Sequence, residues 1–322
     1  MKTKPIYLPL LFAMLLLAFS CSSDDGPGRA QLVLQTDSTS VGEGEEVVFE
    51  VTANGQPISD AQILIDGTAI SGQTHSFDLA GTYHATAQKE GYRDSEPLEI
   101  SILEVQIDVY VAGYEHNGTY YVAKYWKNGT SVNLSNGINA ASAYSVFVSE
   151  GNVYVAGYEY NGTYYVAKYW KNGVPVNLTD GNHFAYAYSI FDSEGDVYVS
   201  GVEDGIAKYW KNGGAVNLND GLNLAYANSI FVSNGDVYVA GHEDNVAKYW
   251  KNGTPINLGD GINNTYATSI FVSKGNVYVV GYEDNGTNTV VKYWKNGTPV
   301  NLTNGTENAR ATSIFVTRTL LE

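Results

Sequence analysis

The residues that could contact a ligand recur at regular intervals in the C-terminal two thirds of the sequence. Five glutamates take equivalent positions in five tandem repeats, namely Glu115, Glu159, Glu203, Glu243 and Glu283. Carboxylates gathered at one rim could hold Ca²⁺, but no repeat contains a dense ligand loop of the EF-hand kind. We therefore expect a solvated acidic rim, with no bound metal and no other cofactor.

A second equivalent position lies just ahead of an expected strand and carries Ser142, Tyr186, Tyr226, Tyr266 or Arg310. Tyrosine presents an apolar ring face and a hydroxyl, which suits both sugars and peptides. The alternative is that these rings only fill space between repeats. The candidate ligand-binding residues are thus the three tyrosines, Arg310, the five glutamates and the unrepeated His183.

The repeats give little indication of catalysis. An enzyme would need a local departure from the repeat that gathers complementary groups, such as two carboxylates about 5–9 Å apart for glycoside cleavage. The unrepeated polar residues at the expected face are His183, Glu307 and Arg310. A surface loop position for His183 is favoured over a general base. We predict no catalytic residue, and a glycan-processing enzyme with an acidic central pocket stays an open alternative.

The repeated motif Lys-Tyr-Trp-Lys-Asn-Gly indicates which strands and turns position these residues. Its tryptophan occurs at Trp126, Trp170, Trp210, Trp250 and Trp294, which lie 44, 40, 40 and 44 residues apart. Repeats of this length with four short strands are typical of β-propeller blades. Asn-Gly predicts a type I′ hairpin, because both residues accept a positive φ. A tryptophan present in every repeat predicts packing between blades more than an aromatic binding platform.

One repeat illustrates the expected strands, at residues 189–193, 196–201, 206–211 and 215–218. In such a blade the loop between the second and third strands and the loop that follows the fourth strand emerge on the same face. The equivalent glutamates and tyrosines lie at these two loops. We therefore expect the candidate residues to gather on one face of the repeat array.

The ends of the array predict how it closes. The first repeat begins at residues 108–111, which match the second strand of a blade, and residues 313–316 (Ser-Ile-Phe-Val) match the missing first strand. Pairing of the two would leave no open sheet edge and would give a five-bladed propeller over residues 106–322. In blade number and repeat length this array resembles the tachylectin-type five-bladed lectins. The resemblance implies glycan binding as a possible function.

Residues 31–105 show no repeat and alternate short apolar-patterned runs with turns such as Asn54-Gly55 and Asp66-Gly67. This pattern predicts a small β-sandwich. Residues 77–87 resemble the corner of immunoglobulin-like modules of bacterial surface proteins, in which a tyrosine pins the corner. The fold class we predict is all-β, an Ig-like β-sandwich followed by the propeller. We expect the sandwich to be a spacer.

The first twenty residues have the pattern of an export signal, with Lys2 and Lys4 ahead of an apolar run of about 14 residues, short of the ~20 that span a bilayer. Residues 18–21 (Ala-Phe-Ser-Cys) resemble a bacterial lipobox, and residues 22–25 (Ser-Ser-Asp-Asp) resemble the surface-export signal of Bacteroidetes-type lipoproteins. The resemblance implies a signal peptide over residues 1–20, lipid on Cys21 and a lipidated tether over residues 21–30. The protein would then face the cell exterior on the outer membrane.

The amino-acid composition limits the classes of binding partner that we expect. The formal net charge is −16 and no Lys/Arg-rich stripe offsets it, so nucleic acid is not expected as a partner. Cys21 is the only cysteine, which excludes a disulfide framework. The function we predict is a lipid-anchored surface protein whose propeller binds extracellular glycan or protein. A structural or assembly component is a further alternative to the enzyme.

Overall fold

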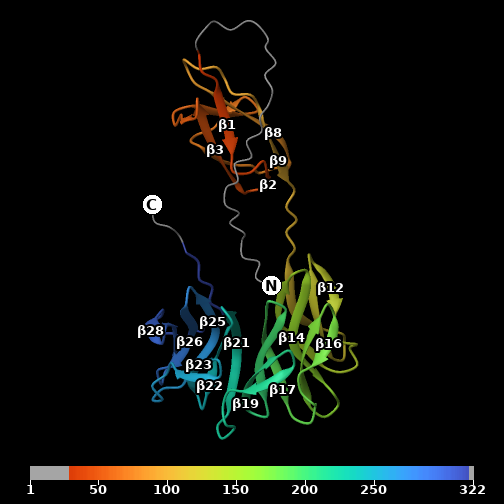
Figure 1. Ribbon diagram of the computed structural model, residues 1–322. Coiled ribbons are helices and arrows are strands. Elements are labelled where there is room, and N and C mark those ends of the chain that lie inside the picture. Colours follow the sequence, from red (N-terminus) through yellow and green to blue (C-terminus); the bar gives the residue numbers. More distant parts are fainter. Residues whose placement is uncertain (1–28, 319–322) are drawn as a thin grey trace. The chain divides into compact units, whose positions relative to one another are not determined.

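The structure is a computed structural model that describes residues 29–318, and these residues are all-β (Figure 1). The chain divides into two compact units at Ile107 and Asp108. The expected signal peptide and Cys21 lie outside the described residues. Among those residues, no helix has the length and apolar character needed to cross a membrane.

The N-terminal unit consists of two sheets around one hydrophobic core. In the first sheet, β3 (Glu46–Ala53) pairs with β1 (Leu32–Thr36), β4 (Gln56–Pro57) and β7 (Thr74–Ser76). The second sheet has the order β2 (Ser40–Gly42), β9 (Leu98–Leu103), β8 (Gly81–Gln88), β5 (Gln62–Ile65) and β6 (Thr68–Ala69). Alternate residues of β3, including Val47, Phe49 and Val51, are buried in the core. This period-two burial is what a sheet with one solvated face requires.

The corner expected from residues 77–87 contains the tyrosine contact. The hydroxyl of Tyr83 donates to the carbonyl of Leu79 at 3.0 Å, and its ring centroid lies 4.6 Å from that of Phe77. The tyrosine thus ties the start of β8 to the turn before it.

The C-terminal unit contains five consecutive antiparallel sheets, which we number one to five. Sheet one has three strands, β10 (Tyr110–His116), β11 (Tyr121–Lys127) and β12 (Thr130–Asn133). Sheet two has β13 (Ala141–Ser149), β14 (Asn152–Tyr160), β15 (Tyr165–Lys171) and β16 (Val174–Asn177). Sheet three has β17 (Ala185–Ser193), β18 (Asp196–Glu203), β19 (Ile206–Lys211) and β20 (Gly214–Asn217). Sheet four has β21 (Ala225–Ser233), β22 (Asp236–Glu243), β23 (Val246–Lys251) and β24 (Thr254–Asn257). Sheet five has β25 (Thr265–Ser273), β26 (Asn276–Asp284), β27 (Thr289–Lys295) and β28 (Thr298–Asn301).

The hairpin between the third and fourth strands has the predicted turn. In sheet two, Asn172 and Gly173 have φ values of 51° and 82°, both positive as a type I′ turn requires. The Asn172 side chain also accepts a hydrogen bond from Val153 N at 2.9 Å, which ties the turn to the start of β14. The Asn-Gly pair therefore sets both the turn and its position against the second strand.

The first strand of each complete sheet is longer than predicted. In sheet three, β17 begins at Ala185, and its register against β18 shifts between Ala187 and Ser189. Opposite this bulge, a Cβ on Gly201 would lie 2.0 Å from the carbonyl oxygen of Tyr186. The bulge brings the two backbones together, so only glycine fits there. Tyr186, Tyr226 and Tyr266 consequently lie inside β17, β21 and β25, and not ahead of them as expected.

Successive sheets pack through the motif tryptophan, as predicted. Trp210 is fully buried in a cluster with Tyr154, Ala156 and Leu178 of the preceding sheet. A hydrogen bond from Ile190 N to the Ser145 hydroxyl oxygen, 3.3 Å long, joins the first strands of sheets two and three. The same bond recurs from Ile230 to Ser189, from Ile270 to Ser229 and from Ile314 to Ser269.

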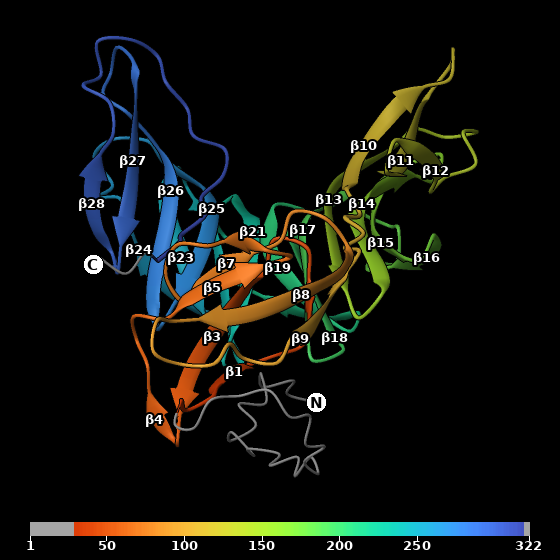
Figure 2. The same cartoon turned by 90° about the horizontal axis from the view of Figure 1, so that it is seen from above.

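The five sheets follow one another in an arc, and the predicted pairing across its ends is not formed (Figure 2). Within residues 29–318, β10 has only β11 as a ladder partner, and residues 303–318 belong to no strand. Residues 311–315 lie instead beside β25, through Thr268, Ser269 and Phe271. These contacts join residues 43 to 45 positions apart. The pairing with β10 would join the two ends of the array and therefore carries the larger loop-closure entropy.

We expect Gly201→Ala to lower the free energy of unfolding by about 1–3 kcal/mol, because the new methyl group must displace the Tyr186 carbonyl. Gly214→Ala is the control, since its Cβ would meet only the Lys211 carbonyl oxygen at 3.3 Å. Urea denaturation of both variants measures the difference. Equal stability of the two variants would contradict the close approach at the bulge.

Candidate ligand-binding site

The two loops expected on one face of each repeat do meet there. In the first repeat, Asn117 Nδ2 donates to the carbonyl of Gly137 at 2.9 Å, which joins the β10–β11 hairpin to the loop after β12. Asn117 Oδ1 accepts from the backbone N–H groups of Thr119 and Tyr120, so the asparagine also forms the turn of its own hairpin. Asn161 and Asn285 make the equivalent loop contact, at 2.9 and 3.3 Å.

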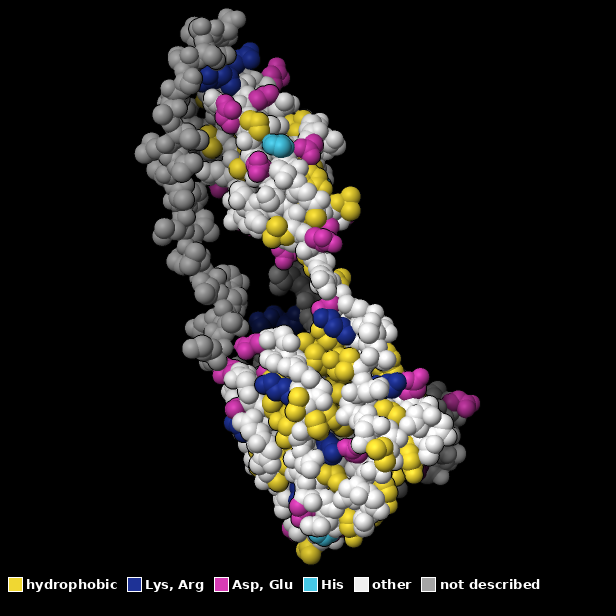
Figure 3. Space-filling model, turned by 90° about the vertical axis from the view of Figure 1, so that its right-hand side faces the viewer, with side chains coloured by type: hydrophobic (Ala, Val, Ile, Leu, Met, Phe, Trp, Pro, Cys, Tyr) yellow, Lys and Arg dark blue, Asp and Glu magenta, His cyan; other side chains and the backbone are white. Residues whose placement is uncertain are grey.

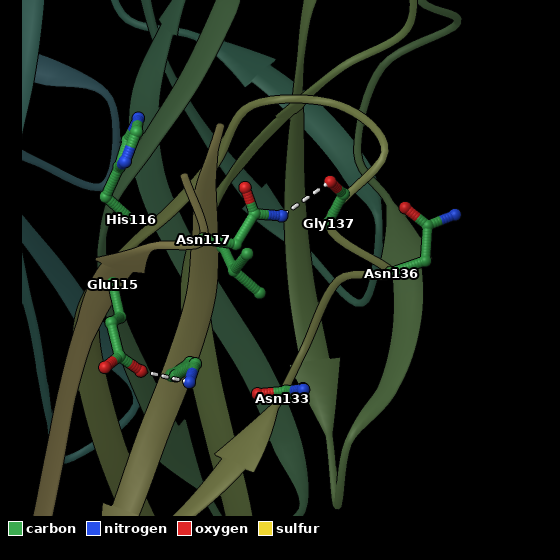
Figure 4. A pocket seen from close by; sticks show the side chains of 8 residues that line it. Glu115, His116, Asn117, Asn133, Asn136 and Gly137 are labelled. Atoms are coloured by element: carbon green, nitrogen blue, oxygen red, sulfur yellow. Dashed lines mark hydrogen bonds and ion pairs between the residues drawn. The ribbon is translucent and has the colours of Figure 1, made fainter. Parts of the chain in front are cut away.

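A polar pocket of about 320 Å³ opens where these two loops meet in the first repeat (Figure 4). Its lining residues are Glu115, His116, Asn117, Val122, Lys124, Asn133, Asn136 and Gly137. Amide, carboxylate and ammonium groups thus supply both hydrogen-bond donors and acceptors around a small space.

The second repeat has a pocket of about 290 Å³ at the same place. It is lined by Glu159, Tyr160, Asn161, Val166, Lys168, Asn177, Asp180 and Gly181, each equivalent to a residue of the first pocket, and also by Asn139. Asn139 belongs to the loop after β12, so the preceding repeat adds one wall. The pocket is therefore a feature of the repeat and not an accident of one loop.

The equivalent glutamates do not form the free acidic rim that we expected. Each accepts a hydrogen bond from the first lysine of its own Lys-Tyr-Trp-Lys-Asn-Gly motif: Lys124, Lys168, Lys208, Lys248 and Lys292. Lys168 and Glu159 are 2.5 Å apart, and their side chains are only 15% and 19% exposed. The two positions pair opposite charges on adjacent strands, so the charge of each glutamate is balanced within its own repeat.

The tyrosines are half-buried in contacts between sheets. The ring of Tyr186 lies 5.1 Å from Tyr158 and 5.4 Å from Tyr165, both in the preceding sheet. Burial raises the pKa of Tyr186 and of Tyr266 above the ordinary value for tyrosine. These contacts agree with the space-filling alternative, and a ligand-binding role for Tyr186, Tyr226 and Tyr266 stays a prediction.

Arg310 also contacts an aromatic ring of the C-terminal unit. Its guanidinium lies 4.8 Å from the ring centre of Tyr282, in cation–π contact, and its side chain is exposed. Other aromatic side chains of the C-terminal unit are open to solvent, including Tyr114, Tyr121 and Tyr144. Hydrophobic side chains are visible among charged ones on the face of this unit that Figure 3 draws.

His183 is close to two carboxylates. Ligand atoms of Asp180, His183 and Glu203 lie within 4.8 Å of one another. Glu203 already accepts from Lys208 at 2.5 Å, and Asp180 accepts from both the backbone and the side chain of Asn182, which lowers the pKa of the Asp180 carboxyl. A cation would have to compete with these partners, so the geometry alone does not identify a metal site.

Sequence reasoning did not identify His242, which is half-buried between aromatic rings. The ring centroid of Tyr226 lies 5.1 Å away in a stacked arrangement, and that of Tyr266 lies 4.9 Å away edge-on. Burial lowers the pKa of His242 to about 4, and its Nδ1 has no hydrogen-bond partner among the described residues. The signal was available, because the equivalent residues are Tyr114, Tyr158, Val202 and Tyr282.

The pocket asparagines and lysines were also not among the predicted site residues. Asn133 and Asn177 occupy the same position at the ends of β12 and β16, and neither side chain makes a hydrogen bond within the described residues. Their recurrence in every repeat was visible in the sequence. It did not indicate that they line a pocket together with Glu115 or Glu159.

Comparisons with known proteins assign no family. No family model and no curated protein matches the sequence. Among solved structures, an auxiliary nutrient binding protein from Bacteroides thetaiotaomicron VPI-5482 is 12% identical with a TM-score of 0.32, covering 89% of this chain and 73% of that chain. One from Bacteroides ovatus ATCC 8483 is 13% identical with a TM-score of 0.33, covering 85% and 71%. Fibronectin(III)-like modules of Clostridium thermocellum CbhA are 12% identical with a TM-score of 0.20, covering 45% and 91%. TM-scores this low carry no argument about shared fold or function.

The Lys168–Glu159 pair gives a test of the charge balance. Lys168→Met leaves the largely buried Glu159 carboxylate without its partner, and we expect a loss of roughly 1–3 kcal/mol in the free energy of unfolding. Lys211→Met is the matched control, because the side chains of the Lys211–Asp196 pair are 48% and 43% exposed and its loss should change stability much less. The double variant Lys168→Met/Glu159→Gln should recover part of the loss. Equal effects of the two single variants would refute the distinction.

His242 predicts a pH dependence of stability. Because its pKa falls from 6.5 unfolded to about 4 folded, the unfolded chain binds the proton first as the pH drops. The stability of the native protein should therefore fall between pH 6.5 and 4, by at most roughly 3 kcal/mol from this residue. His242→Tyr, the residue of three other repeats, should remove this component. Thermal melts of both proteins across this range measure it, and parallel curves would show that His242 does not contribute.

Proposed function

We propose that this protein is a surface-anchored binding protein whose C-terminal unit, a five-bladed propeller, recognises extracellular glycan. The observation that carries the proposal is the pocket that recurs at equivalent positions in the first and second repeats. A repeated pocket gives several similar weak sites, and a polymer with repeated sugar units can engage more than one of them. Avidity then replaces a single tight contact.

The lining chemistry favours a sugar over an apolar ligand. Each pocket presents asparagine amides, a glutamate and a lysine, which together can donate to and accept from adjacent hydroxyl groups. An aromatic ring, His116 or Tyr160, stands at the same edge and offers a face for a sugar ring. The volumes of about 320 and 290 Å³ are at the lower end of ligand pockets, as expected for one or two sugar units.

The proposed arrangement in the cell follows from the N-terminal residues. Lipid at Cys21 would anchor the protein to the outer membrane, facing outward, and residues 31–105 would act as an Ig-like spacer. This part of the proposal is supported by the lipobox-like and Ser-Ser-Asp-Asp sequences alone. A protein partner bound by the exposed aromatic residues is the competing occupant.

A glycan-processing enzyme remains a second candidate for one reason. The pocket of the second repeat contains two carboxylates, Glu159 and Asp180, whereas that of the first repeat contains Glu115 alone. Hydrolysis requires two carboxyl groups on either side of the scissile bond. Release of reducing sugar from a bound glycan therefore belongs to the same experiment.

The test is a glycan panel probed with the full chain carrying Cys21→Ser, which removes the proposed lipid acceptor. We expect selective binding, and the variant Asn133→Ala/Asn177→Ala should weaken it about tenfold through two lost hydrogen bonds. The matched control is Asn217→Ala/Asn257→Ala, at the same positions in the two repeats whose hairpins are shorter. Thermal melts confirm that all variants fold.

The outcomes separate the candidates. Binding that the pocket variant loses and the control keeps supports the proposal. Binding lost only in Tyr186→Phe/Tyr226→Phe/Tyr266→Phe would move the site to the tyrosines. No binding to any glycan by the folded protein would overturn the proposal in favour of a protein partner or a structural role.

A further inference from the structure

Sheet one and the segment 309–317 each carry half of an interface that is complete in sheets three, four and five. The complete version has four parts: the strand ladder, the glycine at the bulge, the serine-to-backbone bond and the tryptophan cluster. Sheets two to five contain the first two parts within themselves, and each makes the tryptophan cluster with the sheet before it. Sheets three to five also make the serine-to-backbone bond with the sheet before them. Within residues 29–318, sheet one has no strand equivalent to β13.

On the β10 side, residues whose equivalents in the other repeats are buried are exposed. Val111 is 52% exposed, whereas its equivalents Val155, Val199, Val239 and Val279 are 1% exposed. Trp126 is only half-buried, whereas the other four motif tryptophans are fully buried. A Cβ on Gly113 would meet only the Trp126 ring, at 3.1 Å, whereas a Cβ on the equivalent Gly157 would lie 2.0 Å from the Ser142 carbonyl oxygen.

On the other side of the gap, residues 309–317 contact sheet five but have no partner on their opposite edge within the described residues. Ile314 N bonds the Ser269 hydroxyl oxygen at 3.3 Å, and the Phe315 ring centroid lies 5.1 Å from that of Phe271. This continues a row of phenylalanines from Phe147 through Phe191 and Phe231 to Phe271, in which neighbours are 4.6–5.0 Å apart. Phe315 is nonetheless exposed. So is Leu302, at 57%, whereas the equivalent leucines of the other sheets are at most 9% exposed.

We propose that the open arc closes into a second, closed form of the unit, in which residues 309–317 add to β10 as the inner strand of sheet one, in the same chain and in one register. By equivalence with β13 and β14, the Cα partners are Arg310 with Tyr114, Ile314 with Val111 and Val316 with Val109. Val111 is then covered, and the Arg310 carbonyl takes the place beside Gly113 that the Ser142 carbonyl takes beside Gly157. Phe315 reaches Phe147, and the Ser313 hydroxyl reaches Val146 N. Leu302 and Trp126 complete the fifth tryptophan cluster.

The closure also completes the first pocket. In the complete repeats, the loop before a sheet bonds the hairpin of that sheet, as Tyr160 N does to the Ala140 carbonyl and Asp204 N to the Phe184 carbonyl. Asn139 of such a loop lines the pocket of the second repeat. Its equivalent for the first repeat is Glu307, which closure brings beside Glu115 and His116. Glu115 is now 62% exposed, whereas the other four glutamates are 14–21% exposed.

A disulfide tests the register. In the full chain with Cys21→Ser, we introduce Val109→Cys and Val316→Cys, which become Cα partners about 4.5–5.5 Å apart, within the range that a disulfide spans. The control is Val111→Cys/Val316→Cys, displaced by two residues or about 6.6 Å along the strand. We expect mild oxidation to give a monomeric disulfide in the first pair, seen as a mass lower by two hydrogen atoms, and much less in the control.

Three results would overturn the proposal. A disulfide-linked dimer would show that the segment pairs with a second copy. Equal oxidation of both pairs would show that no register is set. A reduced monomer that melts like the parent chain would show that the ends stay apart.

Gly113→Ala provides an independent check without cysteine. In the closed form its methyl group meets the Arg310 carbonyl, so the melting temperature of the variant should fall about as far as that of Gly157→Ala. If Gly157→Ala is destabilised and Gly113→Ala melts like the parent chain, no strand lies against β10. Neither result depends on glycan binding, so failure of the closure and failure of the proposed function can be told apart.

Discussion

The contact between one sheet and the next is the constraint on which the C-terminal unit depends. No repeat buries its own tryptophan: Trp210 needs Tyr154, Ala156 and Leu178 of the sheet before it, and the first strands are joined by serine-to-backbone bonds. Stability in such an array is the sum of repeat and interface terms. A sheet without a predecessor therefore leaves apolar surface uncovered, which is the condition of Val111 and Trp126 in sheet one.

The same interface places the candidate site. The bulge between Ala187 and Ser189 brings the first strand close to Gly201, and the strand continues on the other side of the bulge as far as Ala185. There the preceding loop meets the hairpin between the second and third strands. Asn117 and Asn161 then join that hairpin to the loop after the fourth strand. The pocket lies between segments that the framework fixes from both sides, while its lining groups remain free to vary. Such loops on a rigid scaffold commonly carry binding residues.

The features that local chemistry determines could be predicted from the sequence, and those that depend on a partner strand could not. The Asn172-Gly173 turn and the corner at Tyr83 follow from residues close in the chain, and both occur in the structure. The length of β17 depends on a bulge, which no propensity indicates. Lys168 balances the charge of Glu159. The two residues lie on adjacent strands, so their contact can be predicted only once the register of β14 against β15 is known. The glutamates were therefore expected in water, although they are paired.

The central claim is that the loops of a repeat, held by their neighbours, bind sugar. Hydrogen exchange of the full chain, measured with and without the glycan that binds most tightly on the panel, tests it most directly. We predict that bound glycan slows exchange in the peptides that contain residues 115–124 and 133–140, and in those that contain 159–168 and 177–183. Protection confined to other parts of the chain, or none at saturating glycan, would contradict the account.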